Sequence, residues 1–258
     1  RIKALAKLID KIQPDIIHTL EMQHSAYLVM LVKPIVKVKF PVWLLTPWGS
    51  DIYLFGRIDE HKCKIRNVLK YIDGYIPQSK RDVTLAKKIN PQINILPQIM
   101  TNSGYKMEEY KDKRSILRPS DRKCILLKGY QGWAGRALCA LKGMRYIVKE
   151  LRDYTIYIYL PSPEVELYSK LLVADTNINL KIVQYTSQSR ILELQSRARI
   201  SLGLSISDGI PNSLLEAMLM GSFPIESIQG CGEELIRHKE NGMLVDPEEP
   251  SEIAKAII

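Results

Sequence analysis

Residues 200–224 read ISLGLSISDGIPNSLLEAMLMGSFP. The stretch begins as an apolar strand, passes through a polar loop that holds Asp208, and continues as a helix from about Leu214 to Met220. Gly221 follows the helix, at a position where glycine commonly ends one. A loop that leads into a helix attracts anions, because free backbone N–H groups and the helix dipole point outward there. The segment therefore predicts a strand–loop–helix unit of an α/β protein with an anion-binding loop.

Short apolar strands alternate with helical stretches along the rest of the chain. Strands are predicted over residues 15–20, 42–46, 74–78, 93–97, 123–128, 155–160, 180–185, 199–204, 223–227 and 243–245. Helices are predicted between them, for example over 80–89, 136–150, 163–174 and 189–198. This alternation indicates parallel sheets with helices on both faces. Ligands of such sheets bind at the carboxyl ends of the strands.

The chain of 258 residues is long enough for two domains, and a charged stretch at 105–122 separates the two series of strands. We expect domains at 1–104 and 105–258. The first holds 16 Lys/Arg and 8 Asp/Glu, a net charge of +8, and the second holds 21 and 20, a net charge of +1. The basic first half fits an anionic lipid surface or an acidic substrate, and a merely solubilising surface is the alternative. No nucleic-acid-binding motif is present, so no nucleic-acid partner is expected.

The cysteine pattern indicates a reducing compartment. The four cysteines are scattered, and neither a CxxC motif nor a Cys/His cluster with metal-ligand spacing occurs. The longest apolar run, Ala26–Val32, is far shorter than the ~20 residues of a membrane span. We therefore expect a cytoplasmic protein, with peripheral binding at the inner face of the membrane as one use of its basic half.

The pattern Asp208-x7-Glu216, followed by Ala217, Met218, Gly221 and Pro224, resembles the Glu-x7-Glu signature of family 4 glycosyltransferases. The resemblance implies that Glu216 binds the ribose hydroxyls of a donor nucleotide and that Asp208 lies beside the transferred sugar. Asp in place of Glu at the first position keeps the charge and shortens the reach. Both carboxylates are expected to face one cleft.

The loop and helix start of this motif are expected to hold the donor diphosphate. The resemblance assigns this contact to Gly209 and to the backbone amides of Asn212, Ser213 and Leu214. A structural alternative exists, because Ser213-x-x-Glu216 is also a capping box in which Glu216 only satisfies a backbone donor.

A second segment, residues 125–141, reads ILLKGYQGWAGRALCAL. It resembles the first strand and loop of the family's C-terminal domain, where two basic residues pair with the donor diphosphate. Lys128 and Arg136 are the nearest basic candidates, although the usual spacing is not kept. A planar guanidinium suits phosphate oxygens, and Lys supplies a mobile point charge. Two solvated charges are the alternative.

In the first half, residues 14–24 read PDIIHTLEMQH and resemble a strand and loop that face the reacting sugar in the family. His24 and Glu21 are the catalytic candidates from this loop. The acceptor-side candidates are His18, Trp48 and Asp51, the last two from the TPWGSD loop at 46–51. Ordinary polar residues at a strand end, and a turn at 49–51, are the alternatives.

The resemblance implies a GT-B fold, with two Rossmann-like domains that face each other across a cleft. Family members have further segments, so we expect the first domain to be truncated at its start and the second at its end. The implied reaction is retaining and metal-independent transfer of a sugar from a nucleoside diphosphate sugar to a glycan or lipid acceptor, with no cofactor. No DxD motif stands in a strand-end loop to hold a metal. The alternatives are a nucleotide-sugar epimerase on the same fold and a non-catalytic module that binds nucleotide-sugar or an anionic surface.

Overall fold

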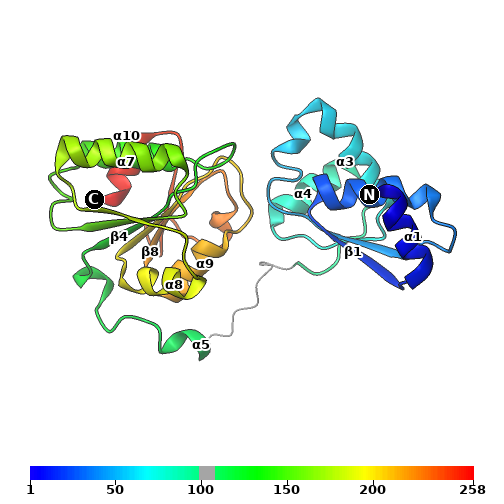
Figure 1. Ribbon diagram of the computed structural model, residues 1–258, viewed down its shortest axis with the longest axis horizontal. Coiled ribbons are helices and arrows are strands. Elements are labelled where there is room, and N and C mark those ends of the chain that lie inside the picture. The colour runs from blue at the N-terminus through cyan, green and yellow to red at the C-terminus, as the bar shows by residue number, and fades with distance from the viewer. Residues whose placement is uncertain (99–107) are drawn as a thin grey trace. The chain divides into compact units, whose positions relative to one another are not determined.

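The computed structural model describes residues 1–98 and 108–258, which belong to two compact units (Figure 1). The first unit runs from Arg1 to Asn102 and the second from Ser103 to Ile258. The sequence predicts a boundary between residues 104 and 105, a position outside the described residues. No helix within the described ranges is long and apolar enough to cross a membrane.

The described part of the first unit contains a parallel sheet in the order β1-β2-β3, formed by β1 (Ile16–Leu20), β2 (Val42–Thr46) and β3 (Gly74–Tyr75). The strand expected at 93–97 reduces to a single bridge between Tyr75 and Ile95. Tyr75 N donates to Asn94 O at 2.9 Å, and Leu96 N donates to Tyr75 O at 2.8 Å. The next N–H of this ladder would have to come from residue 77. That residue is proline and has no N–H, so the ladder stops.

One face of this sheet is packed and the other is open. The packed face carries the buried Trp43 and Leu45 beneath α1 (Ile2–Ile12), α2 (Tyr27–Val32), α3 (Asp59–Tyr71) and α4 (Lys80–Ile89). Helix α4 spans the residues predicted for it, and Ser79 Oγ caps it by accepting from Asp82 N at 3.1 Å. The opposite face exposes Ile16, Leu20 and Val42.

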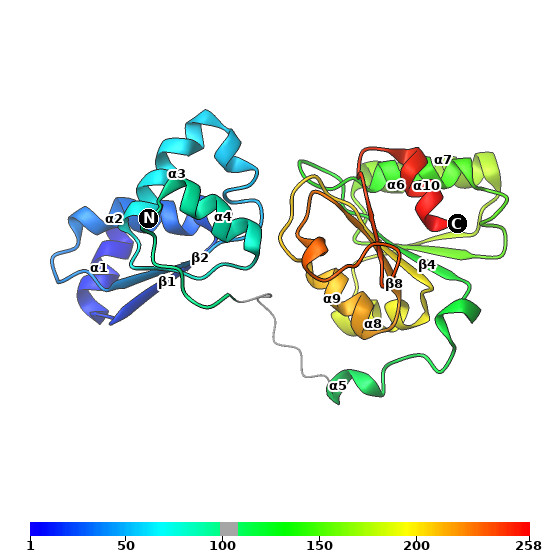
Figure 2. The same cartoon turned by 180° about the vertical axis from the view of Figure 1, so that it is seen from behind.

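The second unit is a Rossmann-like sheet of parallel strands in the order β6-β5-β4-β7-β8-β9 (Figure 2). Its strands are β4 (Cys124–Lys128), β5 (Thr155–Tyr159), β6 (Leu180–Val183), β7 (Ile200–Gly203), β8 (Phe223–Ser227) and β9 (Met243–Val245). Each lies within a stretch predicted to be a strand. The order runs outward in one direction from β4 and in the other from β7, so the sheet has a topological switch point between these two strands.

Helices cover both faces of this sheet, as the alternation in the sequence predicts. On one side lie α6 (Ala137–Tyr146), α7 (Pro163–Thr176) and α10 (Pro250–Ile257), and on the other α8 (Gln188–Arg197) and α9 (Asn212–Leu219) (Figures 1 and 2). The short α5 (Glu108–Lys111) precedes the sheet. The chain after β4 thus turns to one face and the chain after β7 to the other.

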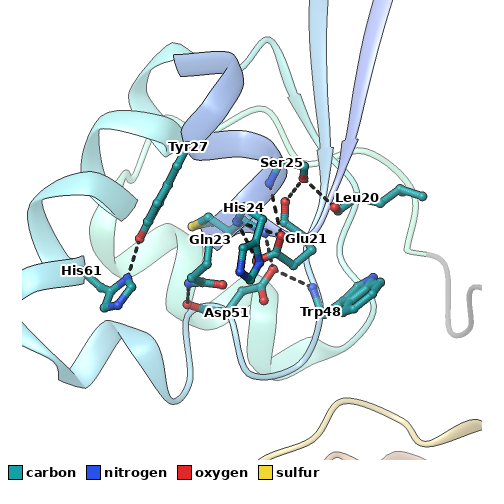
Figure 3. A network of polar contacts seen from close by, with 10 residues as sticks. Leu20, Glu21, Gln23, His24, Ser25, Tyr27, Trp48, Asp51 and His61 are labelled. Atoms are coloured by element: carbon teal, nitrogen blue, oxygen red, sulfur yellow. Dashed lines mark hydrogen bonds and ion pairs between the residues drawn. The ribbon is translucent and has the colours of Figure 1, made fainter. Parts of the chain in front are cut away.

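A buried carboxylate joins the loops that follow β1 and β2 in the first unit (Figure 3). Asp51 Oδ2 accepts hydrogen bonds from Met22 N and Trp48 N, each at 2.8 Å. The Asp51 carbonyl accepts another from Gln23 Nε2 at 2.9 Å. The residue is only 2% exposed, so water contributes little to solvating the charge.

Burial raises the pKa of Asp51 to about 7, although the amides of Trp48 and Met22 favour the ionised form. The negative charges of Glu21 and Asp82 add to the rise. Because the folded-state pKa exceeds the unfolded value, the folded state binds more protons between these two values. The free energy of unfolding therefore falls as pH rises from about 4 to about 7.

We predict that Asp51→Asn abolishes this part of the pH dependence. The amide oxygen can still accept from both backbone N–H groups, but it has no proton to lose. The full shift corresponds to roughly 4 kcal/mol, at about 1.4 kcal/mol per pKa unit. Urea unfolding of wild type and variant between pH 4.5 and 8 measures the difference, with the exposed Glu60→Gln as control. Parallel pH curves for wild type and Asp51→Asn would contradict the assignment.

Candidate functional site

Two loops that leave the switch point are hydrogen-bonded to each other. Arg136 N donates to Leu204 O at 3.0 Å, and Ile206 N donates to Ala134 O at 2.9 Å. Gly135 permits the tight fold of the first loop, since a Cβ there would lie 2.2 Å from the Tyr130 carbonyl oxygen. The loops at 129–136 and 204–211 therefore form one connected structure above the carboxyl ends of β4 and β7.

A small pocket lies at these strand ends. It is lined by residues from both loops, both strands, β8 and the start of α9: Lys128, Tyr130, Gly203, Leu204, Ser205, Asp208, Pro211, Ser213 and Glu226. This is the place where α/β sheets of this order bind their ligands. The structure therefore brings Lys128, Asp208 and Ser213, all predicted from the sequence, to one site.

Lys128 is the last residue of β4 and is half-buried. Gly129, which follows, packs closely on β5 and on the chain just after it, so the backbone at this end of β4 is closely held. A Cβ on Gly129 would lie 2.6 Å from the Ile158 side chain and 2.7 Å from Pro161 Cα. Lys128 is thus a cation on a rigid strand end, a placement that suits contact with a bound anion.

Glu226 is a pocket residue that the sequence analysis missed. It lies on β8 in register with Gly203 on β7, and it is 6% exposed. Burial raises the pKa of its carboxyl well above the usual range, with Asp208 adding to the rise and Lys128 opposing it. The available signal was a glutamate inside the predicted strand at 223–227, directly after the apolar residues 223–225.

Asp208 anchors its own loop as well as lining the pocket. Its Oδ1 accepts from Gly209 N at 2.8 Å, so the amide of Gly209 is engaged within the protein. The Gly209 carbonyl accepts from Cys231 N at 2.9 Å, which ties this loop to the segment after β8. The Gly209 N–H, which the sequence predicts to bind the diphosphate of a nucleotide-sugar, is therefore not available for that contact in this structure.

The capping-box alternative for Glu216 is wrong. Helix α9 starts at Asn212, its N-cap is Pro211, and no side chain caps it. Ser213 therefore lies inside the first turn and cannot act as the N-cap of a capping box. The amide of Leu214 donates to Pro211 O at 3.1 Å, so the predicted diphosphate contact of Leu214 is not available either.

Glu216 is 7% exposed, and its Oε1 accepts from Gln188 Nε2 at 2.7 Å. Gln188 is the first residue of α8, which follows the loop after β6. Glu216 does not line the pocket that contains Asp208. Asp208 therefore lines the pocket and Glu216 is turned toward the start of α8, and a common cleft for the two carboxylates stays a prediction.

Arg136 is occupied within its own loop. Its Nη1 donates to the carbonyl oxygens of Gly132, Ala134 and Gly135, and its Nε pairs with Glu248 at 2.9 Å. It is not among the pocket residues. The structure thus separates the two predicted diphosphate cations, leaving Lys128 in the pocket and Arg136 as a brace of the loop beside it.

The catalytic candidates of the first unit form a local cluster (Figure 3). The Glu21 carboxylate accepts from His24 N and Ser25 N, and it pairs with His24 Nδ1 at 3.2 Å. Glu21 adopts a left-handed φ of 74°, which its capping contacts stabilise. The His24 side chain is 94% exposed, so of the two His24 is the one presented to solvent.

The acceptor-side candidates differ in exposure. Trp48 is 51% exposed, and exposed His18 bonds through Nε2 to Thr46 Oγ1 at 2.8 Å. Asp51 is buried with its Oδ2 occupied, so its structural role as a brace replaces the predicted contact with an acceptor. Within the described residues no group of three His, Cys, Asp or Glu side chains has the arrangement of a metal site.

Two protein-family models match the chain. Residues 132–258 match the model described as glycosyl transferases group 1. Residues 1–79 match the model described as glycosyl transferase 4-like. No curated protein sequence matches the chain. The two matched ranges lie in the two units of the structure, in the order that the family resemblance implies.

Several solved structures are similar to this protein, and each of the three matches given next covers 99% of this chain. Sucrose-phosphate synthase from Thermosynechococcus elongatus has a TM-score of 0.71 at 16% identity, with 66% of its length covered. The structure of HepE from Anabaena in complex with UDP-glucose has a TM-score of 0.74 at 13% sequence identity, and the match covers 71% of the HepE chain. An α,α-trehalose-phosphate synthase from Burkholderia xenovorans, in complex with glucose-6-phosphate, has 0.75 at 11% identity, with 68% covered.

The chain thus spans about two thirds of the length of these structures. At these identities the likeness establishes the fold, and the family models establish the family. Both agree with the parallel sheets and the switch-point pocket described above. The chain belongs to the group 1 glycosyltransferases and has the GT-B fold.

Proposed function

We propose that this protein transfers a sugar from a nucleoside diphosphate sugar to a hydroxyl group of an acceptor. The observation that carries the proposal is the pocket at the β4–β7 switch point, where Lys128, Asp208 and the start of α9 meet. A cation beside a helix start suits a diphosphate. Carboxylates next to it suit the hydroxyl groups of a sugar and a ribose.

In this proposal Glu216 binds the ribose and Lys128 binds the diphosphate. The Glu216 carboxylate is held by Gln188 and makes no cap contact with its own helix. Its second oxygen therefore has a capacity to accept from ribose hydroxyls. Arg136 acts indirectly in this scheme, because its bonds to the loop carbonyls hold the wall of the pocket.

The expected chemistry is electrostatic. When the bond between the anomeric carbon and the diphosphate oxygen breaks, negative charge grows on the leaving diphosphate, where Lys128 and the helix start stabilise it. Asp208 lies near the positive character that develops at the anomeric carbon. We propose that transfer retains the anomeric configuration and needs no divalent metal, as the family membership implies.

The acceptor belongs to the first unit in this proposal. Among the similar structures, the trehalose-phosphate synthase is in complex with glucose-6-phosphate, and a TarM variant is in complex with fondaparinux, α-GlcNAc-glycerol and UDP. The net charge of +8 on residues 1–104 favours an anionic acceptor or an acceptor at an anionic membrane surface. Exposed Trp48 supplies a flat apolar surface on which a sugar ring can stack.

Glu216→Gln should weaken nucleotide-sugar binding about 10-fold or more, because the substitution removes a charged acceptor for ribose hydroxyls. The melting temperature should change little, because Glu216 caps no helix in this fold. Isothermal titration and a thermal melt test the two parts separately. The exposed Glu150→Gln is the matched control. Unchanged donor affinity in Glu216→Gln would refute the ribose assignment.

Lys128→Ala should lower kcat about 100-fold, the scale seen when one preorganised donor to a developing charge is removed. The loss should fall mainly on kcat, since charge on the leaving group grows toward the transition state. Steady-state kinetics beside the exposed control Lys149→Ala gives the comparison. A folded Lys128→Ala enzyme with near-normal kcat would exclude this role.

Activity should persist in EDTA, because Lys128 and the start of α9 supply the positive charge that a metal would otherwise give the diphosphate. The assay measures product formation with EDTA and again after addition of Mg²⁺ or Mn²⁺. Loss of activity in EDTA with recovery on addition of either ion would overturn the metal-independent mechanism.

A further inference from the structure

Glu226 is a buried ionisable group of the pocket to which the proposed function assigns no role. Its side chain extends from β8 over the neighbouring strand β7. A Cβ on Gly203 would lie 2.6 and 2.9 Å from its two carboxyl oxygens. Glycine at position 203 therefore provides the space that the carboxyl occupies, at the floor of the pocket between the ends of β7 and β8.

Charged and titratable groups face Glu226 from several elements. Lys128 at the end of β4 favours its ionised form, and Asp208 on the loop before α9 opposes it. Tyr159 on β5 also faces Glu226: burial raises the pKa of its phenol, and Glu226 and Glu216 add to the rise. Burial outweighs Lys128, so the pKa of the Glu226 carboxyl is raised and its neutral form is favoured.

A neutral carboxyl has both a hydrogen-bond donor and an acceptor. Within the described part of the chain, no hydrogen bond or ion pair engages the Glu226 carboxyl, although the residue is 6% exposed and lines the pocket. An acid in this state leaves the charge of Lys128 available to an anion. Its own O–H and C=O match a hydroxyl group, which also donates and accepts.

We propose that Glu226 forms the floor of the sugar subsite, where its carboxyl hydrogen-bonds a hydroxyl of the sugar that is transferred. This inference rests on the proposed function and adds a specificity-determining residue to it. The pocket then divides by chemistry. Lys128 and the start of α9 take the diphosphate, whereas Asp208 and Glu226 take the sugar, because the Asp208 carboxylate repels phosphate oxygens and both side chains can hydrogen-bond sugar hydroxyls.

The test separates the sugar from the nucleotide. UDP, GDP, ADP and CDP and their glucose conjugates are titrated calorimetrically into wild type, and the pair that binds most tightly is carried forward. Glu226→Ala should weaken the conjugate about 10-fold relative to wild type while the nucleoside diphosphate changes less than about twofold. Glu226→Gln keeps a donor and an acceptor and should remain within about threefold for both ligands at pH 7. The exposed Glu164→Gln is the control.

A second variant gives a measurement that needs no alanine variant. Glu226→Met fills a similar space without a hydrogen-bond donor or a strong acceptor, so it should lose the extra affinity for the conjugate over the nucleoside diphosphate. Glu226→Gln should keep that extra affinity. A merely structural role of Glu226 moves the stability and leaves this ratio unchanged.

The outcomes are distinguishable. If wild type binds no nucleotide or conjugate, the proposed function fails and the inference falls with it. If wild type binds but Glu226→Ala and Glu226→Gln alter both ligands equally, or neither, the proposed function survives and the sugar subsite is wrong. Should Glu226→Ala fail to fold, an extra affinity for the conjugate that Glu226→Met keeps in full overturns the inference.

Discussion

The divergence of two adjacent parallel strands is the constraint on which the rest of the second unit depends. The chain leaves β4 toward one face of the sheet and leaves β7 toward the other. No helix can cover the strand ends at that point, so a crevice remains there. Lys128 and Glu226 belong to strands, so the sheet fixes their positions in the crevice. Asp208 belongs to a loop that is hydrogen-bonded to the segment after β8.

The same physical solution to burying an acid recurs in both units. Asp51 and Glu226 each lie at or just beyond the carboxyl end of a parallel strand, and burial raises the pKa of each. Neither is stabilised by an ion pair in the described residues, so each costs stability in its charged form. The Asp51 carboxylate offsets part of this cost by accepting hydrogen bonds from two backbone N–H groups in different loops, whereas the carboxyl of Glu226 lines the pocket.

Much of this was predictable from the sequence, because strand–helix alternation depends on local periodicity. The strands at 42–46 and 223–227 and the helix at 80–89 begin and end at the predicted residues. Local periodicity cannot show where a side chain points or which residue it contacts. Tertiary structure decides that Gln188 donates to Glu216, that Arg136 donates to carbonyl oxygens of its own loop, and that Asp51 is buried. Glu226 was missed because an acid in a strand has no spacing signature.

The two loops at the switch point share hydrogen bonds, Arg136 N with Leu204 O and Ile206 N with Ala134 O. A further bridge pairs Gly135 with Ser205. These contacts join residues 134–136 of one loop to residues 204–206 of the other. We therefore expect the two loops to move as one body, so that a displacement of one wall of the pocket is transmitted directly to the other.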